Sequence, residues 1–195
     1  MVEATEEPSA EALERAKGVI FKAIEQSKPE PLQTVIQHGF PINDVVQPPG
    51  MTCLMLSASM GTAQITKVIL QLNPDINAQD NRGRTALHFA CRRGNQEIFD
   101  MLVESEEIDY DMQTNAGVTP LMMAVQSGNV KLVASCLNNN LNPFLKDGLE
   151  RTAVDYAQSM TDEAGNSVRK LIKDAMGQWE KQTSEEDRLG AQIEF

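Results

Sequence analysis

The chain has 195 residues, of which 41% are hydrophobic, and a formal net charge of −11. No stretch approaches the roughly 18 uninterrupted apolar residues of a membrane span, so we expect no membrane insertion. The negative charge disfavours general nucleic-acid binding, because the phosphate backbone would repel the protein. Three cysteines at unrelated positions do not resemble a disulfide framework, and we expect them to be reduced and buried.

The N-terminal residues are acidic and contain no apolar core, so they predict no secretory signal. We expect residues 1–8 to form an acidic flexible tail and the protein to be cytoplasmic, with the nucleus and the cytoskeleton or cilium as alternatives. Ser9, followed by Glu11 and an apolar pair, predicts the start of a helix that extends over the end of a repeat stack. Residues 9–49 form a worn first unit, whose apolar positions are in register with later units but whose opening glycine and threonine are missing.

Four later segments restate one pattern of a glycine, a threonine two residues on and then an apolar run. They begin at Gly50, Gly83, Gly117 and, in a degraded copy, Glu150, so the starts are 33, 34 and 33 residues apart. A fixed period in this range is typical of one supersecondary unit stacked on itself, which predicts a solenoid. The units are 50–82, 83–116, 117–149 and 150–182, and an acidic C-terminal tail follows at 183–195.

Each unit also carries signals for the start and end of a helix. The threonine that precedes each apolar run can accept backbone N–H groups as an N-cap, and Pro120 suits the first position of its helix. A glycine then closes the first helix of three units, since a left-handed residue is favoured just past a helix end. The capping threonines are Thr52, Thr85, Thr119 and Thr152, and the closing glycines are Gly61, Gly94 and Gly128.

The repeated residues resemble the ankyrin repeat over roughly residues 17–176. Thr85-Ala86-Leu87-His88 follows the family's T-P-L-H pattern, and Pro74 to Ala78 follows the segment that ends each unit. The resemblance implies an all-α ankyrin-repeat solenoid of stacked helix-turn-helix units with β-turn or hairpin loops. It also implies a non-enzymatic module that binds other proteins through its concave face.

The arginines cluster on this acidic chain. Five of the eight fall at turn tips or at the end of a first helix, where the family places its concave face, and four of the five lie between Arg82 and Arg93, around one turn tip and its first helix. They are either ordinary solvated surface or an electropositive groove that orients an acidic partner. Met51 and Met60 map to tip and groove positions, where we expect exposure and either partner binding or no role. The expected partner-binding residues are Met51, Met60, Asn81, Arg82, Arg84, Arg92, Arg93, Asn115, Gln126 and Arg151.

Catalytic, metal and cofactor sites are not expected. His88 and Cys91 lie three residues apart on one predicted helix and could form a base and a nucleophile, but the family places a structural histidine and a packing residue there. No cysteine and histidine spacing suits a metal, and repeat geometry accounts for the glycines. We therefore expect no enzyme activity and no cofactor.

Several functions stay open at this point. The chain could be an adaptor, a scaffold or a subunit of a larger assembly, or a stoichiometric inhibitor or regulator of a partner enzyme or transcription factor. A more remote alternative is an enzyme that uses Cys91, and another is nucleic-acid binding through the arginines. We expect a protein partner with an acidic segment, no nucleic acid, and a monomer when the chain is alone.

Overall fold

The computed structural model describes residues 9–193, and it describes side chains as far as Lys181. The fold divides into two compact parts at Asp109 and Tyr110. Within residues 9–193 the structure is helical, and the loops between repeats contain turns and one isolated antiparallel bridge between Gln47 and Met51. The described part of the chain is therefore all-α, as the sequence predicts.

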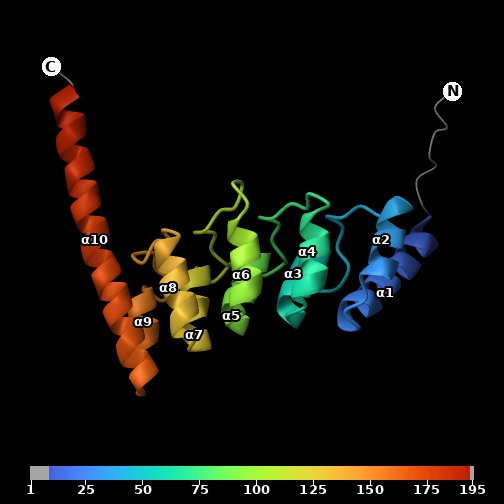
Figure 1. Cartoon of the computed structure of the whole chain (residues 1–195), viewed down its shortest axis with the longest axis horizontal. Coiled ribbons are helices and arrows are strands. Elements are labelled where there is room, and N and C mark those ends of the chain that lie inside the picture. The colour runs from blue at the N-terminus through green and yellow to red at the C-terminus, as the bar shows by residue number, and fades with distance from the viewer. Residues whose placement is uncertain (1–8, 194–195) are drawn as a thin grey trace. The chain divides into compact units, whose positions relative to one another are not determined.

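The first part consists of three helix pairs (Figure 1). First helices contact first helices and second helices contact second helices, so each pair packs on its neighbour. The pairs are α1 (Ala10–Glu25) with α2 (Pro29–Gln37), α3 (Cys53–Met60) with α4 (Ala63–Leu70), and α5 (Ala86–Arg93) with α6 (Gln96–Val103).

The second part contains two pairs, α7 (Pro120–Ser127) with α8 (Val130–Asn138) and α9 (Ala153–Gln158) with α10 (Glu163–Ile193). Helix α10 has 31 residues and contacts both α8 and α9. It continues through residues 183–193, the segment that we expected to form an acidic tail. Figure 1 shows it extending well beyond α9.

The predicted helix signals have their expected roles. Thr85 and Thr119 accept hydrogen bonds from the backbone N–H groups of His88 and Met122, and Ser9 does the same for Ala12. The glycines that follow α3, α5 and α7 all have left-handed backbone angles, with φ of 78°, 67° and 74°. These caps confirm where the first helices begin and end.

Buried side chains fill the space between the first helices α3 and α5. All six residues from Ala86 to Cys91 are buried in α5, and the same is true of Cys53 to Ala58 in α3. The loops are tied by side-chain amides and carboxylates that accept backbone N–H groups about one repeat away: Asn43 from Asp75, Asn77 from Asp109, and Asp111 from Asn142. None of the described helices is both long and apolar enough to span a membrane.

Leu87 tests the repeat register. Its side chain is 1% exposed in α5, so Leu87→Ala removes buried methyl groups and leaves a cavity. We expect a loss of about 2–5 kcal/mol in the free energy of unfolding, measured by urea denaturation. Leu149→Ala is the matched control, because Leu149 is 71% exposed and should change stability by less than about 0.5 kcal/mol. A loss below about 1 kcal/mol at Leu87 would contradict the assigned register.

Candidate partner-binding surface

Three of the predicted arginines are exposed on α5 and the turn before it. Arg82 lies in the turn, and Arg92 and Arg93 form the last turn of α5. Arg93 Nε donates to the carbonyl oxygen of Ser59 at 2.6 Å, which ties it to the preceding repeat. No ion pair to Arg82, Arg92 or Arg93 is found among the side chains described up to Lys181. Arg82 precedes the first residue of α5 by four residues, and Arg92 and Arg93 are the last two residues of the helix. We call Arg82, Arg92 and Arg93 the α5 arginine surface.

Arg84 has a different environment, although it is only two residues from Arg82. Its side chain is 13% exposed and its Nε donates to Asp80 Oδ2 at 2.8 Å. The guanidinium carbon lies 4.6 Å from the centre of the Phe89 ring. Asp80 Oδ1 in turn accepts the backbone N–H groups of Arg82 and Arg84, each at 2.9 Å. The charge of Arg84 is thus neutralised inside the turn.

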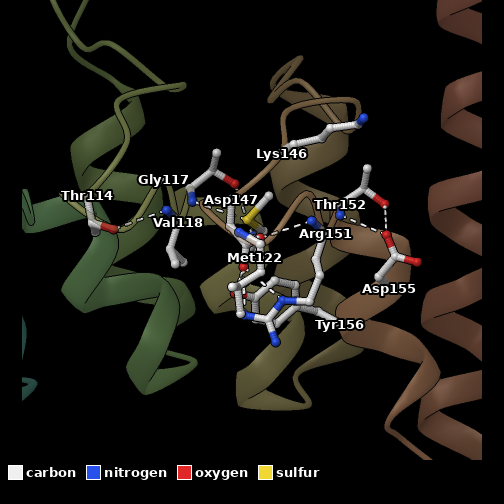
Figure 2. A network of polar contacts seen from close by, with 12 residues as sticks. Thr114, Gly117, Val118, Met122, Lys146, Asp147, Arg151, Thr152, Asp155 and Tyr156 are labelled. Carbon is white, nitrogen blue, oxygen red and sulfur yellow. Dashed lines mark hydrogen bonds and ion pairs between the residues drawn. The ribbon is translucent and has the colours of Figure 1, made fainter.

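Arg151 repeats this arrangement in the second part (Figure 2). Its Nε and Nη2 donate to Asp147 Oδ2 at 2.9 and 2.7 Å, and its guanidinium carbon lies 4.7 Å from the centre of the Tyr156 ring. The Tyr156 hydroxyl also donates to Asp147 Oδ2, at 2.7 Å. Arg151 is 48% exposed on its side chain, so part of the guanidinium remains accessible.

The turn from Thr114 to Val118, which lies in the sequence between the turns of Arg84 and Arg151, has the same hydrogen-bond pattern without the charged side chains. Thr114 takes the place of the aspartate and accepts the backbone N–H of Val118 at 3.1 Å (Figure 2). Val118 stands where the other turns have arginine. A hydroxyl is therefore enough to close the turn, and the aspartate and arginine add an ion pair to it.

These hydrogen bonds shift the pKa of both aspartates downward. Burial opposes ionisation of Asp80, but the side chain of Arg84 and the backbone N–H groups of Arg84 and Arg82 outweigh it and lower the pKa of Asp80. Hydrogen bonds from Arg151 lower the pKa of Asp147 more strongly, with further donors in Tyr156 and the backbone. Burial and the hydrogen bond to Asp147 raise the pKa of Tyr156.

The remaining predicted residues have varied surroundings. Met51 is buried, at 8% exposure, so the expectation that it is exposed was wrong. Its backbone N–H donates to the carbonyl of Gln47 at 2.8 Å, and this bridge holds the side chain within the core. Met60 is half-buried, and Asn81 is exposed while its backbone N–H bonds Pro49 of the preceding repeat. Asn115 and Gln126 are exposed in the second part. The binding role of every one of these residues stays a prediction.

His88 and Cys91 are both fully buried. His88 Nδ1 accepts the backbone N–H of Thr85 at 3.1 Å, which makes the histidine one half of a capping box at the start of α5. The structure thereby confirms the structural interpretation of this histidine. In the part of the chain that the structure describes, no group of three or more histidine, cysteine or carboxylate side chains could hold a metal ion.

Comparison with known protein families agrees with this architecture. The family model for ankyrin repeats in three copies matches residues 20–114, and the model for a single ankyrin repeat matches residues 116–148. The chain belongs to the ankyrin repeat family. Ankyrin repeats are protein–protein interaction modules, so the coarse function is binding to another protein.

The chain is also similar to notch proteins. It is 27% identical over 138 residues to human neurogenic locus notch homolog protein 1 and 28% identical over 141 residues to its zebrafish (Danio rerio) counterpart. Human neurogenic locus notch homolog protein 2 is 28% identical over 138 residues. These matches cover 71–72% of this chain but only 5–6% of each relative. The shared region is thus a small fraction of those proteins.

Sequence reasoning missed the partners of Arg84 and Arg151. Each arginine follows an aspartate by four residues and precedes an aromatic residue by five, in the pairs Asp80 with Phe89 and Asp147 with Tyr156. This shared spacing was a usable signal. It marks two of the five clustered arginines as bound within the protein.

The Asp80–Arg84 pair makes stability depend on pH. We expect Asp80→Asn to cost about 1–3 kcal/mol at pH 7, because it removes a charge-assisted hydrogen bond. A carboxyl group whose pKa is lower in the folded state stabilises the fold above its unfolded pKa of about 3.9 and loses this effect as pH falls towards the folded value. The difference between the parent protein and Asp80→Asn should therefore shrink below about pH 4 in urea melts.

Asp174→Asn provides the control for this experiment, because Asp174 is exposed on α10. Asp174→Asn should leave the free energy of unfolding nearly unchanged at pH 7 and at pH 3. A difference between Asp80→Asn and the parent protein that stays constant from pH 7 to pH 3 would contradict the ion-pair assignment.

The thiols can be tested by chemical labelling. Cys53, Cys91 and Cys136 are all buried, and burial raises the pKa of the Cys53 thiol to about 12. Since the thiolate is the reactive form, all three should react slowly with a thiol reagent in the native protein at pH 7 and quickly in urea. Fast native labelling of Cys91, located by mass spectrometry, would instead indicate an activated nucleophile.

Proposed function

We infer that this ankyrin module binds an acidic segment of a partner protein through the α5 arginine surface. The observation that carries the proposal is the exposure of Arg82, Arg92 and Arg93, with no ion pair among the described side chains, on a molecule whose net charge is −11. Guanidinium groups bind carboxylates through paired hydrogen bonds, so an acidic partner would relieve their mutual repulsion.

The role that best fits this surface is that of an adaptor, scaffold or subunit of a larger assembly, with the cytoplasm as the proposed location. Met60 and Asn81, which lie in the same part of the molecule as α5, belong to the proposed contact surface. Inhibition of a partner enzyme or transcription factor is the second candidate. An inhibitor would bind through the same surface, and its binding would abolish the activity of the partner.

An enzymatic function using Cys91 receives no support from the geometry. Both Cys91 and His88 are fully buried, and His88 Nδ1 is engaged at the start of α5. Nucleic-acid binding is disfavoured by the overall charge of the chain.

The test is charge reversal at residues that do not hold the fold. Arg82→Glu combined with Arg92→Glu should weaken partner binding by at least about 30-fold where these groups are desolvated, which corresponds to about 2 kcal/mol. Partners are first captured from cell extract with the tagged full chain and identified by mass spectrometry. The affinity of each purified partner is then measured by calorimetry at fixed ionic strength. Arg84 is left unchanged, because its substitution would remove the partner of Asp80.

Lys22→Glu combined with Lys28→Glu is the matched control. Both lysines are exposed in the first part and lie outside α5 and its turn, and the two double variants change the net charge equally. The control should bind within about twofold of the parent protein. Equal loss in both variants, with unchanged melting, would overturn the assignment to the α5 arginine surface.

A further inference from the structure

A second surface lies in the first part of the molecule, at the C-terminal ends of α4 and α6. These helix ends and the loops that follow them enclose a groove of about 900 Å³. Its apolar lining includes Leu70, Ile76 and Met101, and three glutamates line it from the end of α6 onward: Glu104, Glu106 and Glu107. We call this the α4–α6 groove. Leu70 and Met101 are half-buried, so apolar surface remains accessible in it.

The groove has a negative potential. Among the side chains described, none of the three glutamates has an ion pair, and Lys67 is the one lysine that lines the groove. Helices α4 and α6 also end here, at Leu70 and Val103, and the C-terminal end of a helix carries a partial negative charge. The carboxylates and the helix ends therefore both add negative charge to the groove, and both favour a cationic ligand.

The loops that form the groove are held in place by hydrogen bonds. Asn77 Nδ2 donates to the carbonyl oxygen of Glu107 at 2.7 Å, and Asn77 Oδ1 accepts the backbone N–H of Asp109 at 2.9 Å. Asn43 fixes the other end of the first loop by accepting the N–H of Asp75 at 2.7 Å. Because the walls are already ordered, a ligand would lose little free energy in ordering them.

We propose that the α4–α6 groove binds a basic segment of a partner protein, with one apolar side chain on Leu70 and Met101 and flanking lysines or arginines facing the glutamates. The combination of apolar lining and unpaired carboxylates selects this chemistry, since apolar contact supplies affinity and charge supplies orientation. A metal ion is a poor fit, because the described carboxylates do not gather into a group that could hold one.

The charge of the chain argues against its own occupation of the groove. The C-terminal segment contains Glu185, Glu186 and Asp187, so like charges would meet there. A second copy carries a net charge of −11, although its α5 arginine surface is positive, so binding of a second copy is tested as a separate outcome. The proposal does not rest on the α5 arginine surface, which selects an acidic segment. Two surfaces of opposite sign on one part of the molecule instead suit two different partner segments.

The experiment uses a phage-displayed library of random 12-residue peptides, selected on the full chain and counterselected on the double variant Glu104→Lys, Glu106→Lys. Both glutamates are exposed, and lysine is favoured near a helix C-terminus, so this variant should fold. Glu107 is kept, so that the loop residue anchored by Asn77 is left unchanged. The affinity of each enriched peptide is then measured by fluorescence polarisation.

We expect enriched peptides to carry lysine or arginine around an apolar residue. The Kd of these peptides should be at least tenfold higher for the double variant Glu104→Lys, Glu106→Lys than for the parent protein. It should rise less than twofold for the matched control, the double variant Glu25→Lys, Asp174→Lys, which changes the net charge equally. Replacing the apolar peptide residue by serine, or Met101 by glutamine, should weaken binding at least fivefold. Nuclear magnetic resonance shifts should then map to residues 67–76 and 101–107 and leave Arg82 and Arg92 unaffected.

Other outcomes would overturn the proposal. These are a selection without enriched clones, enriched peptides that lack basic residues, or equal weakening by the two double variants. Concentration-dependent dimerisation that Glu104→Lys, Glu106→Lys abolishes, measured by analytical ultracentrifugation, would assign the groove to a second copy of the chain. Failure at this groove would leave the effect of Arg82→Glu, Arg92→Glu on acidic partners intact, so the two proposals are separable.

Discussion

Within each part of the molecule, the packing of first helices against one another is the contact on which the rest of the structure depends. An eight-residue helix such as α5 is too short to persist in water by itself. Its six residues from Ala86 to Cys91 are buried, and α3 supplies one of the surfaces that cover them. Stability is therefore the sum of neighbouring interfaces, and the longer helices at the two ends of the described chain, α1 and α10, extend beyond the repeating length.

The same dependence on neighbours explains why the turns carry so many polar side chains. A turn that must meet the next repeat cannot leave buried N–H groups unsatisfied, so Asp80, Thr114 and Asp147 accept them at equivalent positions. Where the acceptor is a carboxylate, an arginine four residues on balances its charge. The positive charge of Arg84 is therefore balanced within the turn, and that of Arg151 is balanced in part, so neither is fully available to a partner.

The repeating features of the fold could be predicted, because period and helix caps are local. Thr85 and Gly94 mark the two ends of α5, and Pro120 begins α7, as the sequence indicates. The environment of a single surface residue was harder to predict. The burial of Met51 follows from a bridge to Gln47, and the α4–α6 groove needs two loops about 30 residues apart to be joined by Asn77. Such contacts depend on how repeats meet, which the pattern within one repeat does not contain.

The charge distribution of the first part bears on the choice between adaptor and inhibitor. An inhibitor needs one surface that covers its target, whereas an adaptor must hold two partners without competition between them. Arg82, Arg92 and Arg93 lie on α5 and its turn, and Glu104, Glu106 and Glu107 lie beyond the end of α6, so each cluster attracts the charge that the other repels. If both proposed surfaces bind, their opposite potentials would keep the two partner segments from exchanging places, because each would meet like charge at the wrong surface. On this ground we propose that the chain fixes the order of two proteins in an assembly.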